Sequence, residues 1–169
     1  MSRDFTIRPA EPGDAAALVA LANEVGSEPG GWLITTSNWR TVNDERRYLR
    51  SIRRYSHAAV YVAEADEWVV GRLSVGRDAH PASHHVADLG LMVAQSYRRR
   101  GVGRALLEAA VDWARSHEVS KLELHVFPHN EGAIALYDQF GFEREGYRKR
   151  HYRRPDGYVD AILMAYEVT

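Results

Sequence analysis

The sequence predicts a single α/β domain, residues 1–169, in which helices cover both faces of a mixed, mostly antiparallel sheet. Its length is typical of one domain, and its 45% hydrophobic and 27% charged residues are ordinary for a globular protein. Apolar patterns of strand and helix period follow one another in the order β-α-α-β-β-β-α-β-α-β-β. Hairpins stand beside two β-α-β passages, which predicts three layers with the sheet in the middle.

The first third of the chain predicts one strand and two helices. Phe5–Arg8 alternates apolar and polar residues, as a short strand does. Asp14 is placed to cap a helix that carries an apolar stripe of Leu18, Leu21, Ala22 and Val25. Residues 26–31 contain Pro29-Gly30-Gly31 and predict a loop. A second helix is expected over 43–54, with Tyr48, Leu49 and Ile52 facing inward.

The rest of the chain alternates strands with two further helices. Strands are expected over 58–63, 68–75, 86–93 and 121–127, the first two forming a hairpin. Helical spacing runs from Val102 to about His117, and another helix begins near Pro128 and Asn130 and ends at Gly141. Two final strands flank the turn signal Arg154-Pro155-Asp156-Gly157.

Composition excludes several classes of function. The chain has no cysteine, which rules out disulfides, thiolate metal sites and a cysteine nucleophile. A net charge of −1 argues against a non-specific nucleic-acid binder. The N-terminus has no apolar stretch, and no apolar run approaches the ~18 residues of a membrane span. We therefore expect a cytoplasmic protein with neither nucleic-acid nor membrane partners.

The most informative segment is the turn that follows the strand 86–93. It reads Arg98-Arg99-Arg100-Gly101-Val102-Gly103-Arg104 and opens a helix. Unpaired N–H groups at a helix start, with glycines that allow close approach, suit a pyrophosphate. The segment lacks the ending of a Walker A loop and the glycine spacing of a dinucleotide fingerprint. The alternative is a helix start beside a solvated arginine patch.

Motifs further along the chain help to interpret this turn. Arg98-x-x-Gly101-x-Gly103, followed by the segment Asn130–Tyr137 and by Gly141-Phe142, resembles the GNAT superfamily of N-acetyltransferases. The C-terminal Gly157–Ala161 with Met164 is similar to small bacterial members that act on amino acids or on a ribosomal-protein alanine. The resemblance runs from Ile7 to about Tyr166. It implies an acetyl-CoA-dependent enzyme, and homodimers occur in the family.

The resemblance also implies where acetyl-CoA lies. The cofactor is expected between two parallel strands that splay apart near Val93 and Val126, with a bulge at Gly90 as the expected cause. Backbone groups of Leu91, Met92 and Val93 would pair with the pantetheine arm. The turn Arg98, Arg99, Arg100, Gly101, Val102, Gly103 and Arg104 would hold the pyrophosphate. Asn130 matches a cofactor-contacting position, and it is also a natural helix N-cap.

The catalytic groups follow from the same resemblance. Tyr137 matches the tyrosine that protonates the departing thiolate, although a helical aromatic is more often part of the core. His125 stands where the ribosomal-alanine group has a glutamate base, and Asp88 lies near the base position of other members. Glu123 shares the face of His125. Positioning alone, with water as the base, is the remaining alternative.

The acceptor is expected to be a small amine or amino acid, or a protein N-terminus. Glu24, Glu28 and Trp32 are candidates to hold its ammonium group, or else ordinary loop residues. The basic segment Arg144–Arg154 would contact an anionic group, or else would be a solvated edge hairpin. His80, His84 and His85 lack nearby carboxylates and predict a solvated loop, so no metal is expected.

Overall fold

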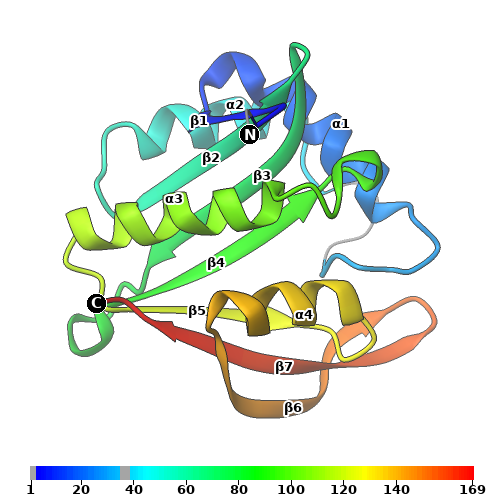
Figure 1. The fold of residues 1–169 in the computed structure, drawn as a ribbon, viewed down its shortest axis with the longest axis vertical. Helices are drawn as coiled ribbons and strands as arrows, with labels where there is room; N and C mark the ends of the chain where they lie inside the picture. Colours follow the sequence, from blue (N-terminus) through cyan, green and yellow to red (C-terminus); the bar gives the residue numbers. More distant parts are fainter. Residues whose placement is uncertain (1–2, 35–38) are drawn as a thin grey trace.

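The computed structural model describes residues 3–34 and 39–169 as one seven-stranded sheet with helices on both faces (Figure 1). The strands are β1 (Thr6–Pro9), β2 (Ala58–Ala65), β3 (Trp68–Arg77), β4 (Val86–Val93), β5 (Lys121–Val126), β6 (Glu143–Arg154) and β7 (Gly157–Glu167). The α-helices are α1 (Ala15–Gly26), α2 (Val42–Ile52), α3 (Val102–Ser116) and α4 (Glu131–Phe140). Short 3-10 turns are η1 (Pro12–Asp14), η2 (Pro81–Ser83) and η3 (Gln95–Tyr97).

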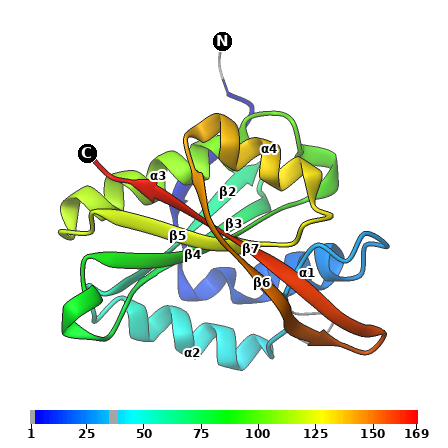
Figure 2. The same cartoon turned by 90° about the horizontal axis from the view of Figure 1, so that it is seen from below.

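The helices form the two outer layers of a three-layer domain. Figure 2 shows α3 and α4 on one face of the sheet and α1 and α2 on the other. The sheet order is β1-β2-β3-β4-β5-β7-β6, and every neighbouring pair is antiparallel except β4 with β5. The predicted α/β class, element order and mixed sheet are confirmed.

The parallel pair β4–β5 is joined only at its beginning. Its pairing runs through Val86 with Lys121 and Ala87 with Leu122 and stops at Asp88 with Glu123. Both strands continue beyond that point, and Figure 1 shows them diverging toward the end where α3 begins. The predicted splay is confirmed.

The predicted bulge at Gly90 is wrong. The register of β4 on β3 runs without a shift from Ala87 opposite Arg77 to Val93 opposite Gly71, so Gly90 lies in regular strand opposite Ser74. The splay instead arises because β4 stays paired with β3 along its length while β5 stays paired with β7 from Lys121 to Val126. Strand β4 follows β3 and strand β5 follows β7, so β4 and β5 separate beyond their last shared pair.

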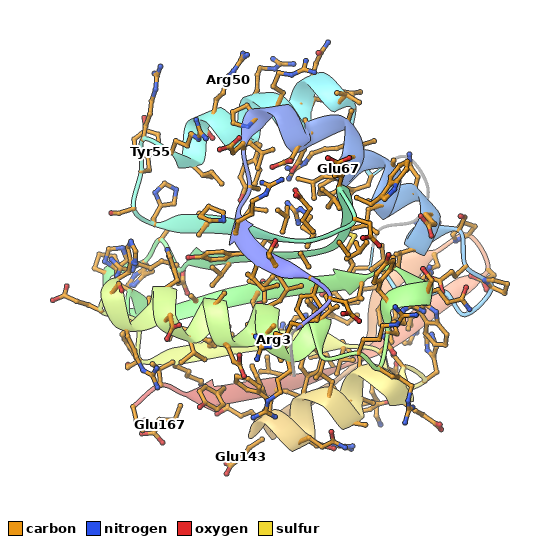
Figure 3. All side chains as sticks on the ribbon, turned by 45° about the horizontal axis from the view of Figure 1, so that its top comes forward. Arg3, Arg50, Tyr55, Glu67, Glu143 and Glu167 are labelled. Carbon is orange, nitrogen blue, oxygen red and sulfur yellow. The ribbon has the colours of Figure 1, made fainter. Side chains whose placement is uncertain are left out.

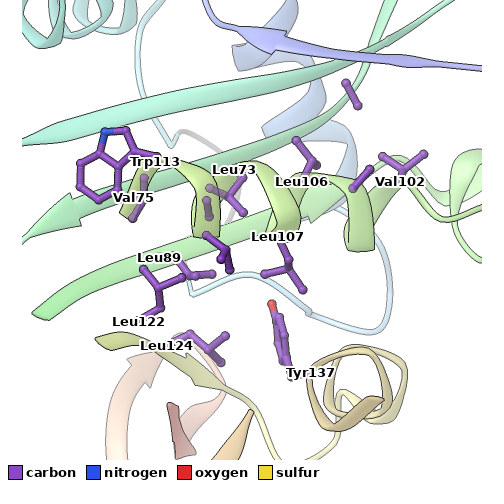
Figure 4. Close-up of a cluster of buried hydrophobic side chains, with 14 of the residues drawn as sticks. Leu73, Val75, Leu89, Val102, Leu106, Leu107, Trp113, Leu122, Leu124 and Tyr137 are labelled. Atoms are coloured by element: carbon purple, nitrogen blue, oxygen red, sulfur yellow. The ribbon is translucent and has the colours of Figure 1, made fainter. Parts of the chain in front are cut away.

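The main core lies between α3 and the sheet. Leu106 and Leu107 of α3 are fully buried and cluster with Leu73 of β3, Leu89 of β4 and Leu122 of β5 (Figure 4). A stripe of apolar residues on one side of α3 explains why this helix forms and where it docks. Because side chains alternate along a strand, the polar residues between these leucines face the opposite layer, which contains α1 and α2.

Helix α4 has the ends that its sequence predicts. Asn130 Oδ1 accepts a hydrogen bond from the Ala133 N–H at 3.3 Å, which confirms the N-cap. Gly141 adopts φ +116°, a left-handed conformation that ends the helix. At α1 the expected cap is absent, because the Asp14 carboxylate instead accepts from the Arg8 guanidinium and the Glu11 N–H.

A buried charge network fastens α2 to the sheet. Glu45 of α2 is fully buried and pairs with Arg72 of β3 at 3.4 Å and with Arg40 at 2.7 Å. The Trp39 ring lies over both guanidinium groups, 4.8 Å from each. The apolar stripe of α2 at Leu49 is thus supplemented by ion pairs between the buried Glu45 and two arginines. The sequence pattern of α2 gave no sign of this buried glutamate.

No helix in the described ranges 3–34 and 39–169 is long and apolar enough to cross a membrane. The outer face of α2 is strongly polar, and Figure 3 shows Arg50 and Tyr55 projecting from this part of the chain into solvent.

Removal of Glu45 should cost much more stability than removal of an exposed partner on the same helix. We expect Glu45→Ala to lower the free energy of unfolding by about 3–5 kcal/mol, because Arg72 is left buried and uncompensated. Arg47→Ala, which breaks an exposed pair with Asp44, should cost less than about 1 kcal/mol. Urea denaturation of both variants measures the difference, and equal losses would contradict the burial argument.

Candidate functional site

The open seam between β4 and β5 presents unpaired strand edges. The Ala94 N–H donates to the Val70 carbonyl, on the β3 side. Backbone groups alternate in direction along a strand, so those of Met92 also face β3, whereas those of Leu91 and Val93 face the seam. An extended ligand can therefore pair with Leu91 and Val93 as an added strand would.

The turn at the start of α3 offers a row of backbone donors. No acceptor among the described residues takes a hydrogen bond from the N–H groups of residues 99–104. Gly101 has φ +86° and Arg99 has φ +60°, which is uncommon for a residue with a side chain. These left-handed residues turn successive N–H groups outward at the positive end of the α3 dipole. The geometry suits a phosphate group.

The arginines of this turn differ in how far their guanidinium groups are already bonded to other protein groups. Arg98 Nε donates to the Val93 carbonyl at 3.0 Å, and its two terminal nitrogens donate to the Glu28 carboxylate at 2.7 and 2.6 Å. Arg98 is therefore committed to protein groups. Arg99 and Arg100 are exposed, and Arg104 is exposed beside Glu108 at 3.4 Å. Positive charge at the turn thus comes mainly from the arginines other than Arg98.

Gly103 allows α4 to pack closely against the start of α3. A Cβ atom built at Gly103 would lie 2.7 Å from Leu136 Cδ2, closer than carbon atoms can approach. A side chain at this position would therefore displace the Leu136 methyl group, the flexible end of an α4 side chain that packs on Gly103. Val102 beside it is buried in the core, and Asn130 is engaged as the cap of α4.

Tyr137 extends from α4 into the side of the seam that α3 covers. Figure 4 shows it among the leucines of the core, with its hydroxyl directed away from α4. The residue is buried, and burial raises the pKa of its phenol. Its hydroxyl has no hydrogen-bond partner among the described residues, yet its oxygen is not among the fully buried polar atoms. The phenol therefore keeps its proton, and its hydroxyl can donate a hydrogen bond.

Two carboxylates meet on the opposite face of the seam. Asp88 and Glu123 are register partners at the last β4–β5 pair. The Asp88 side chain is exposed to solvent at the strand surface, yet the protein atoms around it partly desolvate the carboxyl, and with the neighbouring charge of Glu123 they raise its pKa to about 6. Asp88 is therefore mostly ionised at neutral pH but is a stronger base than an ordinary aspartate.

His125 lies two residues after Glu123 on β5, and the two side chains are on the same face of the strand, as predicted. Its Nδ1 and the Tyr152 hydroxyl lie 2.6 Å apart. Burial, with the charges of Arg148 and His151, lowers the pKa of the imidazole, so the ring is neutral at physiological pH. A neutral imidazole can accept a proton. Both sequence-predicted bases therefore have suitable protonation states.

The three predicted acceptor residues are not brought together. Glu24 is exposed on α1 and has no ionic partner among the described residues, and Glu28 is held by Arg98. Trp32 stacks on His129 with ring centroids 5.7 Å apart. Of the three, only Trp32 lies near the residues that follow β5.

The loop after α1 is tied to the site by side chains that the sequence patterns did not single out. His129 Nε2 lies 3.0 Å from the Gly30 carbonyl, and Arg154 donates to the carbonyls of Gly31 and Leu33 at 3.2 and 3.1 Å. Arg154 also lies 5.4 Å from the Phe127 ring centroid. The basic composition of the hairpin was the only signal, and it cannot identify which arginine reaches across. Most other residues of β6 are exposed at the sheet edge.

The histidines of the 80–85 loop are exposed. His80 Nδ1 accepts from the Ala82 N–H at 3.1 Å and so caps the turn η2. In the part of the chain that the structure describes, no three His, Asp or Glu residues are arranged to hold a metal ion.

Comparison with known proteins gives one family. The profile of the Acetyltransferase (GNAT) family matches residues 30–142, which is more than half of the chain. A structure of a GNAT-family acetyltransferase from Streptococcus pneumoniae superposes with a TM-score of 0.89 at 27% identity, covering 98% of this chain and 99% of that one. The structure of yncA from Salmonella typhimurium, solved with acetyl-CoA, superposes at 0.86 with 19% identity, over 98% and 94% of the two chains.

Two relatives from Escherichia coli are similar in sequence. An L-amino acid N-acetyltransferase is 40% identical over 108 residues, which are 62% of this chain and 65% of the relative. A ribosomal protein bS18-alanine N-acetyltransferase is 40% identical over 79 residues, 47% of this chain and 53% of the relative. The chain thus matches each over between half and two thirds of the relative's length.

Asp88 should titrate far above an ordinary aspartate. We expect a midpoint near pH 6 in carboxyl carbon NMR spectra, since the charged form is disfavoured by desolvation and by Glu123. Glu123→Gln should move that midpoint downward, because it removes the repulsion and leaves the desolvation. A midpoint near 4 in the native protein, or one that Glu123→Gln leaves in place, would contradict the geometry described for the seam.

Proposed function

Because the chain belongs to the Acetyltransferase (GNAT) family, we propose that it transfers an acetyl group from acetyl-CoA to the amine of a small molecule or amino acid. The observation that carries this proposal is the open seam, which combines free strand edges, free helix-start N–H groups and a buried, unpartnered tyrosine hydroxyl. The sequence similarity to an L-amino acid N-acetyltransferase supports the acceptor class.

The residues around the seam fit acetyl-CoA. The N–H groups of residues 99–104 would hold the pyrophosphate, with Arg99, Arg100 and Arg104 adding charge. The backbone groups of Leu91 and the N–H of Val93, which face the seam, would pair with the pantetheine arm. Arg98 acts differently from the expectation that it holds phosphate, since its guanidinium fixes the Val93 carbonyl and Glu28. When bound, the cofactor supplies an activated acetyl thioester.

The acceptor amine would approach from the face that carries Asp88, Glu123 and His125. An amine is protonated at neutral pH and loses a proton before it attacks the acetyl carbonyl carbon. Asp88, with its raised pKa, or His125, neutral through its lowered pKa, would take that proton. Attack is direct within a ternary complex, since the chain has no cysteine to carry the acetyl group.

Tyr137 would act on the departing sulfur. A thiol has a pKa of about 8.5 and an ordinary phenol about 10, so full proton transfer from the phenol to a thiolate is uphill. Burial raises the pKa of Tyr137 further. The phenol therefore acts chiefly by donating a hydrogen bond that stabilises developing negative charge on sulfur in a dry site.

A second acceptor class has its own support. The 40% identity to a ribosomal protein bS18-alanine N-acetyltransferase favours an N-terminal amine of a protein as the alternative acceptor. The family resemblance implies a glutamate in that group at the position of His125. An acceptor peptide would need room beside the loop that His129 and Arg154 hold in place.

The test is thiol release from acetyl-CoA across a panel of small amines, free amino acids and N-terminal peptides. Turnover with free amino acids and not with peptides is the expected result, and the reverse selects the protein acceptor. CoA at about 100 times its Kd should raise the free energy of unfolding by about 2.7 kcal/mol. Stabilisation by CoA without turnover on any acceptor would instead indicate a non-catalytic acyl-CoA-binding module, and an unchanged melting temperature would overturn the proposal.

Tyr137→Phe should separate chemistry from binding. We expect kcat to fall by about 10²-fold while the Kd for CoA changes little, because only the hydroxyl is removed from a packed ring. Tyr166→Phe is the matched control, since that ring packs on the same Phe142. Steady-state kinetics and calorimetric CoA titration measure both quantities. Parallel losses of kcat and affinity would assign Tyr137 to packing instead.

A further inference from the structure

The β6–β7 hairpin contains an irregularity that places Tyr152 beside His125. Arg148 pairs with Ala161 and the next pair is Tyr152 with Val159, so three residues of β6 stand opposite Asp160 alone. Such a bulge bends a strand and redirects its side chains. The hairpin lies outside the segment 30–142 that the family profile matches.

Asp160 holds the bulge from the other strand. One carboxylate oxygen accepts from the Arg150 N–H at 2.6 Å, and the other accepts from the Tyr147 hydroxyl at 2.6 Å. Arg150 adopts φ +50°, an uncommon backbone conformation that these contacts support. The strand is thereby fixed in the path that brings Tyr152 over β5.

Tyr152 is then held against three rings. Its ring centroid lies 4.7 Å from that of His151, 5.9 Å from that of Phe127 and 6.0 Å from that of His125, all with edge contacts. The residue is half-buried, and its hydroxyl is 2.6 Å from His125 Nδ1. This distance is short for a hydrogen bond between a hydroxyl and a ring nitrogen. The contact therefore determines which nitrogen of His125 remains available to the seam.

Charges around the pair favour one direction for this hydrogen bond. Burial raises the pKa of the Tyr152 phenol, the negative charge of Asp88 on β4 raises it further, and Arg148 opposes the shift. The negative charge of Asp88 favours an orientation of the phenol in which its hydrogen is directed toward the carboxylate, and this orientation turns an oxygen lone pair toward His125 Nδ1. Burial of the imidazole, together with the charges of Arg148 and His151 of β6, favours its neutral form.

We infer that Tyr152 is a positioning residue that accepts a hydrogen bond from His125 Nδ1–H and so leaves Nε2 unprotonated as the general base of the reaction. The inference rests on the proposed function and chooses between the two candidate bases. His125 Nε2 takes one proton from the acceptor's ammonium group, and the free amine then attacks the acetyl carbonyl carbon. As the nitrogen–carbon bond forms and the carbon–sulfur bond breaks, the second amine proton leaves with the CoA sulfur, so that CoA departs as the thiol. Nδ1–H stays bonded to the Tyr152 oxygen, which stabilises the imidazolium. The ring later returns the proton to water.

The assignment predicts the sign of a pH effect. An imidazolium N–H is a stronger donor than a neutral one, so a hydrogen bond to Tyr152 raises the pKa of His125 relative to the same site without the hydroxyl. Tyr152→Phe should therefore shift the acidic limb of kcat/KM to lower pH. It should also lower kcat by about 10-fold, part of the 10²–10⁴-fold that a general base contributes. Tyr158→Phe removes an exposed hydroxyl from the same hairpin and should change neither quantity.

An acidic limb that moves to higher pH would mean that Tyr152 donates to Nδ1. Nε2 would then carry the hydrogen, and the inference would be overturned. A lower kcat with an unmoved limb would assign Tyr152 to packing alone and would overturn it equally.

A second measurement does not depend on activity. Long-range proton–nitrogen NMR spectra report which imidazole nitrogen carries the hydrogen, and His125→Gln identifies the His125 signals. We expect Nδ1–H in the native protein and a mixture of both forms in Tyr152→Phe. If no acceptor is acetylated, the proposed function fails while this spectrum still tests the hydrogen bond. If transfer occurs and the spectrum shows Nε2–H, the inference fails and Asp88 is left as the base.

Discussion

Parallel pairing between β4 and β5 stops at Asp88 and Glu123, and the site is arranged around the free strand edges beyond that point. The opening needs no bulge in β4, because β3 and β7 hold their neighbours along their full lengths. The two faces of the sheet at the gap between β4 and β5 therefore carry different side chains. The face under α3 and α4 receives the buried phenol of Tyr137, and the opposite face receives Asp88, Glu123 and His125.

Charged side chains connect the segments that border this gap. The two-point pair of Arg98 with Glu28 joins the turn at the start of α3 to the loop after α1, and Arg98 Nε also occupies the Val93 carbonyl. Arg154 joins the same loop to the tip of the β6–β7 hairpin. Partly buried pairs of this kind contribute specificity of position more than net stability. The loop is thus fixed both by the turn at the start of α3 and by the tip of the β6–β7 hairpin.

Local sequence signals predict the fold, the turn at the start of α3 and the common face of the β5 side chains. Periodicity located the strands and helices, and the glycines of the turn, Asn130 and Gly141 identified the ends of α3 and α4 because those ends depend on adjacent residues. Alternation along β5 placed Glu123 and His125 on one face. Glu28 was a candidate acceptor contact or an ordinary loop residue, and its pairing with Arg98, 70 residues away, is not visible in any local pattern. Tyr152 reaches His125 through a bulge whose support, Asp160, lies on the facing strand. Contacts between distant segments set these positions, and a pattern within one segment cannot show them.

Backbone hydrogen exchange in the presence of CoA tests the seam most directly. If the gap between β4 and β5 is the acyl-CoA site, CoA should slow exchange of the N–H groups of residues 99–104 and of Leu91 and Val93, since all of them lack acceptors without it. Exchange in α2, on the far side of the site, should change little. Unaltered exchange in both segments at saturating CoA, or protection confined to another surface, would contradict the assignment.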